Sequence, residues 1–296
     1  MLKMKYIIVT GGAGFIGSNL IKVLSKSKSY KIISLDNYFT GSKKNHIISK
    51  NIQYINGDTI NISRKLEKLK NKIKVVFHFA EFSRIAQSFD ENRKCFKSNI
   101  LGSYEVINFC LKNNIKIIYS ATSASLGNNG QDQNLSPYAF SKSNNMNLIM
   151  NLNEWFGLKY EIIYFYNVYG PNQIYDTFMA AVVGIFEKCF IEKKSFPVVR
   201  PGTQSRKFTH VEDTVNACIY AWKKNKNAHY SISNDKSYSI INLARMFGGQ
   251  IKFLPQRRGE RFQSSVINRI RDKKIIKLKG QISLKKYINK FKEENK

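Results

Sequence analysis

Short apolar runs alternate with longer amphipathic stretches through the first 170 residues of the chain. The apolar runs are brief and end at polar or glycine residues, which is typical of buried parallel strands; they cover residues 5–10, 31–35, 52–55, 73–79, 115–119 and 160–165. Helical periodicity marks residues 13–27, 96–113 and 137–156. This strand–helix alternation predicts an α/β fold with a doubly wound parallel sheet.

The alternation weakens after Gly170, where shorter elements are separated by prolines at 171, 197, 201 and 255. We therefore predict a doubly wound domain over residues 1–166, with a return segment near 205–230. Residues 167–296 are expected to form mainly a smaller mixed α/β lobe.

The composition suits a chain with an enclosed core. Of the 296 residues 43% are hydrophobic, and no apolar run reaches 18 residues, so no membrane span is expected. The first residues carry no signal-peptide pattern, which predicts a cytoplasmic protein. The cysteines are far apart and form no Cys-x-x-Cys pair, so we expect buried thiols in a reducing compartment and no metal site; they are Cys95, Cys110, Cys189 and Cys218.

The net charge of +29 is the unusual feature of the composition. It would suit a basic protein that binds nucleic acid or a membrane surface, and this alternative stays open. However, the lysines are spread along the whole chain, and only Arg269 to Lys296 is densely basic. Compositional drift explains this distribution better than a dedicated nucleic-acid interface.

A glycine-rich turn, Thr10-Gly-Gly-Ala-Gly-Phe-Ile-Gly17, follows the first predicted strand and opens the first predicted helix. Glycines there permit a tight turn and close approach of a pyrophosphate to the helix N-terminus. Asp36 ends the second predicted strand, about 20 residues further on, where a carboxylate accepts hydrogen bonds from the adenosine ribose. Because it would repel a 2′-phosphate, Asp36 favours NAD over NADP.

Tyr138 and Lys142 lie four residues apart at the start of a predicted helix, so they share one helix face. A neighbouring ammonium stabilises phenolate, which suits a tyrosine that removes a proton from a sugar hydroxyl. Such spacing is also common on solvated helices. Thr122 ends the fifth predicted strand, where parallel sheets bind ligands, and its hydroxyl could bond the same substrate hydroxyl.

Together these motifs resemble the NAD-dependent nucleotide-sugar epimerase/dehydratase family of extended short-chain dehydrogenases, particularly the sugar-nucleotide 4-epimerases, from about residue 5 to 245. The resemblance implies a Rossmann sheet, an NAD cofactor, a nucleotide-sugar substrate and a catalytic set of Thr122, Tyr138 and Lys142. Further similar segments are Asn56-Gly-Asp58, His78-Phe-Ala80, Asn99-Ile-Leu-Gly102, Tyr166-Asn-Val-Tyr-Gly-Pro171, Arg206 to Asp213 and Arg257-Arg-Gly-Glu260.

The same resemblance assigns residues to each ligand. The cofactor-binding set is Gly11, Gly14, Phe15, Ile16, Gly17, Asp36, Asn37, Asp58, Thr59, Phe79, Ala80, Asn99, Ser120, Tyr138 and Lys142. The substrate-binding set is Ser83, Arg84, Thr122, Asn167, Arg206 and Arg257, in which the two last arginines would hold the diphosphate. A homodimer through helices near 96–113 and 137–156 is the family expectation.

The implied chemistry is oxidation at C4 of the sugar to a 4-keto intermediate. Dehydratases and decarboxylases of this family carry a glutamate close after the threonine, whereas Ser123 and Ala124 follow Thr122 here, so both reactions are disfavoured. A 4-epimerase and a 4-dehydrogenase that releases the keto sugar both remain. Two departures from epimerases, the segment Glu81-Phe-Ser-Arg84 and Leu126, leave the epimerase only slightly ahead.

Five other positions have structural interpretations. We expect His78 to be a packed core histidine and His210 to support the loop of Arg206. Tyr164 stands where the family commonly has arginine, so a structural ion pair is expected to be missing. Trp155 and Phe156 fall at helical spacing and are predicted to be core residues.

Overall fold

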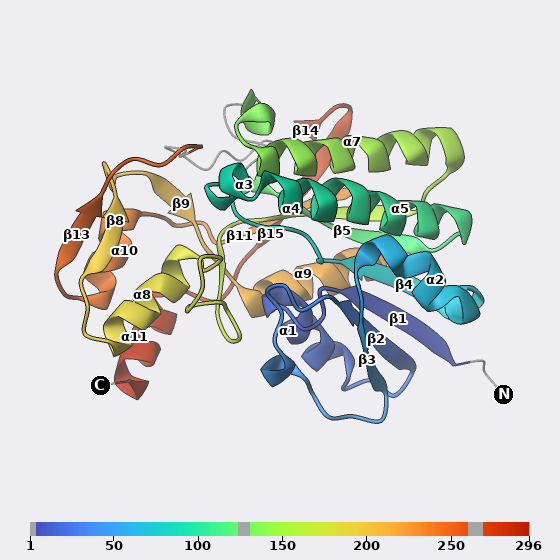
Figure 1. Ribbon diagram of the computed structural model, residues 1–296, viewed down its shortest axis with the longest axis horizontal. Helices are drawn as coiled ribbons and strands as arrows, with labels where there is room; N and C mark the ends of the chain where they lie inside the picture. Colours follow the sequence, from blue (N-terminus) through green and yellow to red (C-terminus); the bar gives the residue numbers. More distant parts are fainter. Residues whose placement is uncertain (1–3, 124–130, 260–268, 296) are drawn as a thin grey trace.

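A nine-stranded sheet forms the centre of the protein in a computed structural model that describes residues 4–123, 131–259 and 269–295. The strand order is β14-β15-β11-β6-β5-β4-β1-β2-β3, and every neighbouring pair is parallel except β14 with β15. Figure 1 shows helices on both sides of this sheet, so the doubly wound α/β prediction is confirmed. The strands are β1 Lys5–Thr10, β2 Tyr30–Asp36, β3 Ile52–Asn56, β4 Ile73–His78, β5 Lys116–Thr122, β6 Tyr160–Phe165, β11 His229–Ser233, β14 Arg269–Ile270 and β15 Lys273–Lys279.

The central strands are apolar on both faces because each face is covered by helices. On β1, Ile8 faces one core, while Ile7 and Val9 face the other. The first core packs under α2, α5 and α7, and the second under α1 and α9 (Figure 1). These helices are α1 Phe15–Leu24, α2 Ile62–Leu66, α5 Ser103–Lys112, α7 Pro137–Phe156 and α9 Val211–Lys224.

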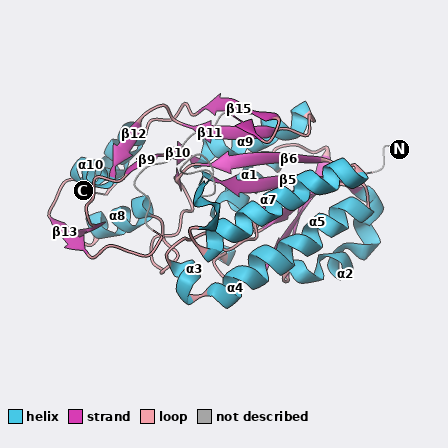
Figure 2. Cartoon of the chain, turned by 90° about the horizontal axis from the view of Figure 1, so that it is seen from above, coloured by secondary structure: helices cyan, strands magenta, loops and turns pink. Residues whose placement is uncertain are grey.

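A smaller lobe stands at the carboxyl end of the strands, on the left in Figure 1, and has its own core of aromatic and aliphatic side chains. Its elements are α8 Val182–Ile191, β8 Phe196–Val199, β9 Ser205–Lys207, β12 Ser237–Ser239, α10 Ile240–Phe247, β13 Ile251–Leu254 and α11 Leu284–Glu294. The chain does not divide at one point, because β14 and β15 return residues 269–279 to the main sheet (Figure 2).

The remaining elements are short and lie around the strand ends. They are the α-helices α3 Gln87–Asp90 and α4 Asn92–Phe96, the 3-10 turns η1 Lys43–Asn45, η2 Thr59–Asn61, η3 Glu67–Lys72 and η6 Gln131–Asn134, the π-helical segment η4 Lys97–Gly102, and the paired strands β7 Val168–Tyr169 and β10 Thr209–His210. The helix predicted over 96–113 is thus interrupted by the π-helical segment η4.

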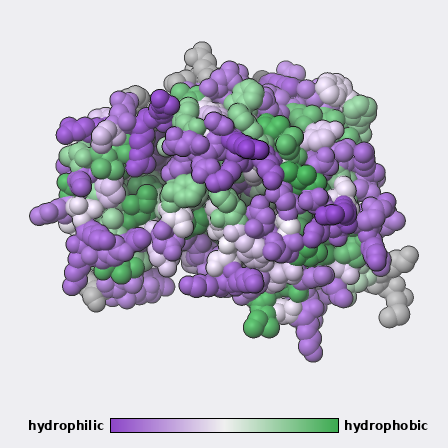
Figure 3. All heavy atoms as spheres, in the orientation of Figure 1, coloured by the Kyte–Doolittle hydropathy of each residue, from purple (hydrophilic) through white to green (hydrophobic). Residues whose placement is uncertain are grey.

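The visible surface is largely hydrophilic. On the face in Figure 3 hydrophilic residues cover most of the surface and apolar residues form scattered groups. Within the described ranges, no helix combines the length and hydropathy that crossing a membrane requires.

Two sequence interpretations about the core need correction. Trp155 and Phe156 are 62% and 67% exposed, because the buried face of α7 ends at Met150 and the last turn extends past it. Cys189 is only partly buried, whereas the other three cysteines are buried.

Candidate active site

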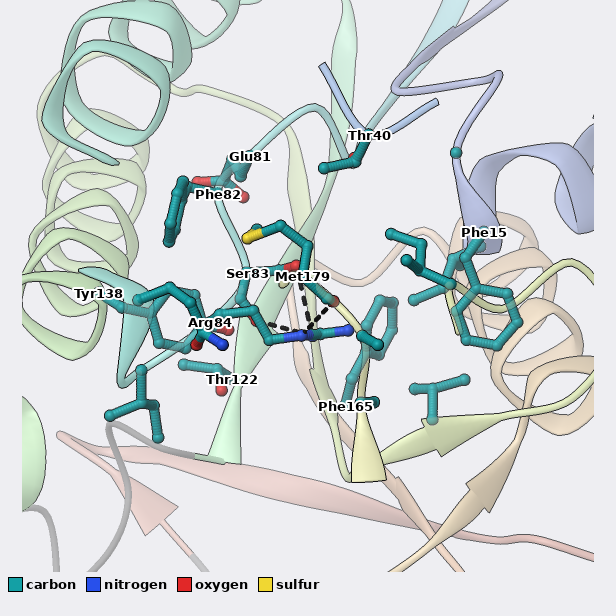
Figure 4. Close-up of a pocket in the computed structure, with 18 of the residues that line it drawn as sticks. Phe15, Thr40, Glu81, Phe82, Ser83, Arg84, Thr122, Tyr138, Phe165 and Met179 are labelled. Atoms are coloured by element: carbon teal, nitrogen blue, oxygen red, sulfur yellow. Dashed lines mark hydrogen bonds between the residues drawn. The ribbon is translucent and has the colours of Figure 1, made fainter. Parts of the chain in front are cut away.

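A cavity of about 690 Å³ lies at the carboxyl ends of the strands and extends to the smaller lobe. Its wall takes residues from the glycine-rich turn at one end and from β5, α7 and the lobe at the other. Figure 4 is a close-up of this cavity, in which Thr122, Tyr138 and Arg84 lie close together. This is the position that parallel α/β sheets use for ligands.

The glycine-rich turn is closely packed. Gly11 has φ +70°, and a Cβ there would lie 2.9 Å from the backbone nitrogen of Ala80. A Cβ on Gly17 would lie 2.1 Å from the carbonyl oxygen of Gly11. The α1 helix begins after Gly14 without a side-chain cap, so its first N–H groups are available to an anion. These features fit a dinucleotide pyrophosphate.

Replacing Gly17 with alanine is expected to abolish retention of NAD. The new Cβ would clash with the Gly11 carbonyl oxygen. Gly11 has little room to move away, because the backbone of Ala80 packs closely against it. The measurement is the NAD content of purified protein and its affinity by calorimetry. Gly157→Ala is the matched control, because that glycine has φ +72° with open space around it; it should lose stability, by about 1 kcal/mol, and keep NAD affinity.

Asp36 lies at the far end of the cavity and is held by backbone groups. Its carboxylate accepts hydrogen bonds from the N–H of Ala13 at 2.9 Å and of Tyr38 at 2.8 Å. Burial raises the pKa of Asp36, and those N–H groups act in the opposite direction. The carboxylate is thereby oriented beside the glycine-rich turn, as a ribose acceptor should be.

Three further residues complete this end of the cavity. Asn37 Nδ2 donates to Asp58 Oδ2 at 3.4 Å, and Asp58 Oδ1 caps η2 through the N–H of Ile60 at 3.1 Å. Thr59 is buried against them and lines the same wall. Their hydrogen bonds fix side chains that could contact the adenosine part of a dinucleotide.

Tyr138 and Thr122 reach the other end of the cavity from different elements. Thr122 is the last residue of β5, and Tyr138 is the second residue of α7. The helix begins there because Ser136 accepts the N–H of Ala139 at 3.1 Å and Pro137 occupies the first helical position. Both side chains extend to the cavity wall in Figure 4.

Lys142 Nζ forms a buried ion pair with Glu81 and also donates to the carbonyl oxygen of Ser120. Glu81 accepts further hydrogen bonds from Tyr119 OH at 2.9 Å, Ser103 Oγ at 3.0 Å and Asn145 Nδ2 at 3.2 Å. The side chains of Lys142 and Glu81 are each 3% exposed. Sequence reasoning noted Glu81 only as a departure from epimerases and missed this pairing.

Burial favours neutral forms in this pair, and the two charges oppose that effect. Burial lowers the pKa of Lys142, which Glu81 partly restores. For Glu81, burial would raise the pKa, but Lys142 and the surrounding donors hold it below its usual value. The pair is therefore an ammonium–carboxylate contact at neutral pH.

Arg84 crosses the middle of the cavity. Its Nε donates to the carbonyl oxygen of Met179 at 2.7 Å, and its Nη1 donates to that of Ser83 at 2.8 Å. Figure 4 places the guanidinium between Tyr138 and Phe165. Ser83 and Arg84, which were predicted to bind substrate, therefore both line the cavity.

The cavity end toward the smaller lobe carries the expected anion-binding residues. Arg206, on β9, is 9% exposed, and its Nη1 donates to the carbonyl oxygen of Ser205 at 2.9 Å. Arg257 lies on the loop after β13, and both arginines line the cavity. Asn167 lines it too, and its Nδ2 donates to the carbonyl oxygen of Lys207 at 2.8 Å. Two guanidinium groups on one wall suit a diphosphate.

Of the expected ligand-contacting residues, Asn99 alone does not line this cavity. Its side chain is completely buried and exchanges hydrogen bonds with the backbone of Phe82, at 2.6 and 3.0 Å. Asn99 therefore shapes the segment after β4, which itself lines the cavity. Phe79, Ala80 and Ser120 do line the cavity.

The structure also shows the surroundings of the three other residues for which the sequence predicted structural roles. His78 is completely buried between Thr10 and Ser103, and burial lowers its pKa to about 4, so it is a neutral core histidine. His210 caps α9 through the N–H of Glu212 at 3.3 Å. Tyr164 bonds His229 Nδ1 at 2.9 Å. Ala124, Leu126 and Glu260 lie outside the described residues.

Known proteins similar to this chain identify the family to which it belongs. Residues 7–234 match the model of the NAD dependent epimerase/dehydratase family. A Methanocaldococcus jannaschii protein named "Putative UDP-glucose 4-epimerase" is 31% identical, with 83% of each chain covered. The solved UDP-N-acetylglucosamine 4-epimerase of Methanobrevibacter ruminantium, in complex with UDP-N-acetylmuramic acid, is 29% identical, with a TM-score of 0.80 and 89% of each chain covered. UDP-glucuronic acid decarboxylase 3 of Arabidopsis thaliana is 27% identical, with 80% of this chain and 72% of the relative covered.

Proposed function

Because the chain belongs to the NAD dependent epimerase/dehydratase family, whose cofactor is NAD, we propose that it is a 4-epimerase of a nucleotide-activated sugar. The observation that carries this proposal is the position of Tyr138 and Thr122. Both line one end of a continuous cavity whose other end carries the glycine-rich turn and Asp36. A sugar held beside Tyr138 would have its diphosphate near Arg206 and Arg257.

The chain's own residues supply the acid–base work. Tyr138, as phenolate, removes the proton from the C4 hydroxyl, and Thr122 orients that hydroxyl by a hydrogen bond. NAD, which the glycine-rich turn and Asp36 would hold, would supply a reversible hydride acceptor for C4, and return of the hydride to the opposite face of the ring would give the epimer. Tyr138 then returns the proton to the new C4 oxygen, so the enzyme ends in its starting state.

Product analysis tests this proposal. The protein, with its cofactor content determined first, is incubated with UDP-, GDP-, CDP- and dTDP-linked sugars. Formation of the C4 epimer without net absorbance of NADH at 340 nm is expected for at least one of them. If none undergoes hydride transfer, the proposed function is wrong.

A 4-dehydrogenase is the second candidate, and Arg84 is the observation that favours it. An epimerase must let the keto sugar rotate in the site. Here the guanidinium crosses the cavity and bonds the carbonyl oxygen of Met179 at 2.7 Å, which narrows the space beside Tyr138. Release of a 4-keto sugar with one equivalent of NADH would support this candidate over the epimerase.

A further inference from the structure

The loop after β4 includes the four-residue segment 81–84, which places one carboxylate and one guanidinium beside the Tyr138/Lys142 pair. Glu81 lies at the start of this segment and Arg84 at its end. Both change the electrostatic potential at Tyr138, which matters if Tyr138 has the acid–base role of the proposed function, on which this inference rests.

Glu81 balances the charge of Lys142. The two side chains form a contact ion pair, and each is 3% exposed, so solvent screens the pair little. Two of the three ammonium donors are taken, one by Glu81 and one by the carbonyl oxygen of Ser120. The field of such a neutral pair falls off faster than that of a free cation. Lys142 therefore offers Tyr138 less positive potential than an unpaired lysine would.

Arg84 supplies positive charge on the cavity side. Its hydrogen bonds go to two backbone carbonyl oxygens and, at 3.5 Å, to the hydroxyl of Ser83, and it forms no ion pair with any carboxylate of the described residues. The guanidinium stays charged at all relevant pH values. Burial lowers the pKa of Arg84, and the negative charge of an ionised Tyr138 raises it, which is the mark of two interacting groups. Tyr138 lies beside it in Figure 4.

Three other titratable groups around Tyr138 are neutral near pH 7. Burial raises the pKa of Tyr119 well above its usual value and that of Cys95 to about 11. Burial lowers the pKa of His78 to about 4. Lys142, Glu81 and Arg84 thus carry charge beside Tyr138. Asp132, buried on η6 against α7, is a further carboxyl group of this region, and Lys94 and Lys97 also line the cavity.

We propose that in this chain Arg84, and not Lys142 alone, provides the positive charge that stabilises the Tyr138 phenolate, while Glu81 is a positioning residue that holds Lys142 against β5. Glu81 and Arg84 carry opposite charges, so together with Lys142 they leave a net positive charge beside Tyr138. This arrangement would explain why a buried acidic residue is tolerated next to the lysine of the active site.

The test is the pH dependence of the first-order rate of hydride transfer. Arg84→Met is expected to move the acid limb upward by about one pH unit or more, because a nearby cation is lost. Glu81→Gln is expected to move it downward by a similar amount, because an anion is lost. Arg84→Lys keeps the charge and should keep the acid limb near that of the wild type. The double variant E81Q/R84M should return toward the wild type.

Tyrosine labelled with ¹³C at Cζ gives a second reading that needs no turnover. The Tyr138 resonance is identified by its absence in Tyr138→Phe, and its titration is followed in the wild type, Arg84→Met and Arg84→Lys. If the pKa of Tyr138 rises in Arg84→Met and not in Arg84→Lys, the proposal is supported even when no sugar is turned over. In that case only the proposed function fails. If Tyr138 titrates identically in all three proteins, the proposal is overturned.

A substrate-binding role for Arg84 gives a different result. If the guanidinium only pairs with an anionic sugar, Arg84→Met raises KM for that sugar and leaves both the acid limb and the Tyr138 titration unchanged. That outcome also overturns the proposal. Since Arg84 lies at the cavity and outside the two main cores, its variants are expected to fold even if Glu81→Gln does not.

Discussion

Replacing Tyr138 with phenylalanine is expected to slow hydride transfer about 10²- to 10⁴-fold, the range that a positioned acid–base group contributes. The change removes one hydroxyl from a side chain that is 8% exposed and leaves the ring in its cluster with Phe82, Cys95 and Met179. Packing is thus retained while the proton acceptor is lost. The measurement is the single-turnover rate with the sugar that the wild type accepts.

Tyr104→Phe is the matched control for this experiment, because that tyrosine is 48% exposed on α5 and does not line the cavity. It should keep the wild-type rate. NAD content and the denaturant midpoint of Tyr138→Phe should equal those of the wild type. An unchanged rate in a Tyr138→Phe protein that holds NAD would mean that another group removes the proton.

The elements nearest the site were predictable because their signals are local. A buried parallel strand must be apolar on both faces, which gives runs such as Ile7-Ile8-Val9. The bounds of α7 follow from Ser136 and Pro137 at its start and from Gly157 at its end, where the backbone has φ +72°. The glycine-rich turn was predictable for the same reason, because a Cβ at Gly11 or Gly17 would lie within 3 Å of backbone atoms.

The errors arose where tertiary contacts override local pattern. The helix predicted over 96–113 is present, but the sequence did not reveal that its turns are π-helical over η4. Gly102 ends this segment, where a Cβ would lie 2.4 Å from Thr59 Oγ1 of η2. Trp155 and Phe156 have core-like side chains, but the sequence does not reveal that the buried face of α7 ends before them. Their exposure could not be deduced from periodicity.

The ion pair of Glu81 with Lys142 joins residues 61 positions apart, and no sequence period connects them. The available signal was weaker: an acidic residue stands three positions after the end of β4, at the sheet edge where ligands bind. A charge at that position needs a partner, since burying it alone is costly. Lysine on the adjoining helix α7 was the obvious candidate once the strand order was known.

Replacing Glu161 with alanine is expected to destabilise the protein by about 3–5 kcal/mol, because it breaks a buried ion pair. Glu161 is completely buried on β6, and its Oε1 lies 2.5 Å from Lys116 Nζ on β5. Its carboxylate also accepts the backbone N–H groups of Lys226, Asn227 and Ala228, at 2.7 to 3.2 Å. The variant would leave a buried ammonium unpaired and those N–H groups without their acceptor.

Denaturant unfolding at pH 7 measures this effect, with Glu67→Ala as the control. Glu67 pairs with Lys70 at 2.6 Å, the same kind of contact, but its side chain is 60% exposed, so its loss should cost less than about 1 kcal/mol. The double variant K116M/E161Q should recover much of the stability, since no unpaired charge remains and the glutamine oxygen still accepts one or two N–H groups. If Glu161→Ala cost no more than Glu67→Ala, burial would not be what makes this pair important. The pairing of β5 with β6 would then be stabilised by its backbone hydrogen bonds and apolar contacts without a contribution from the ion pair.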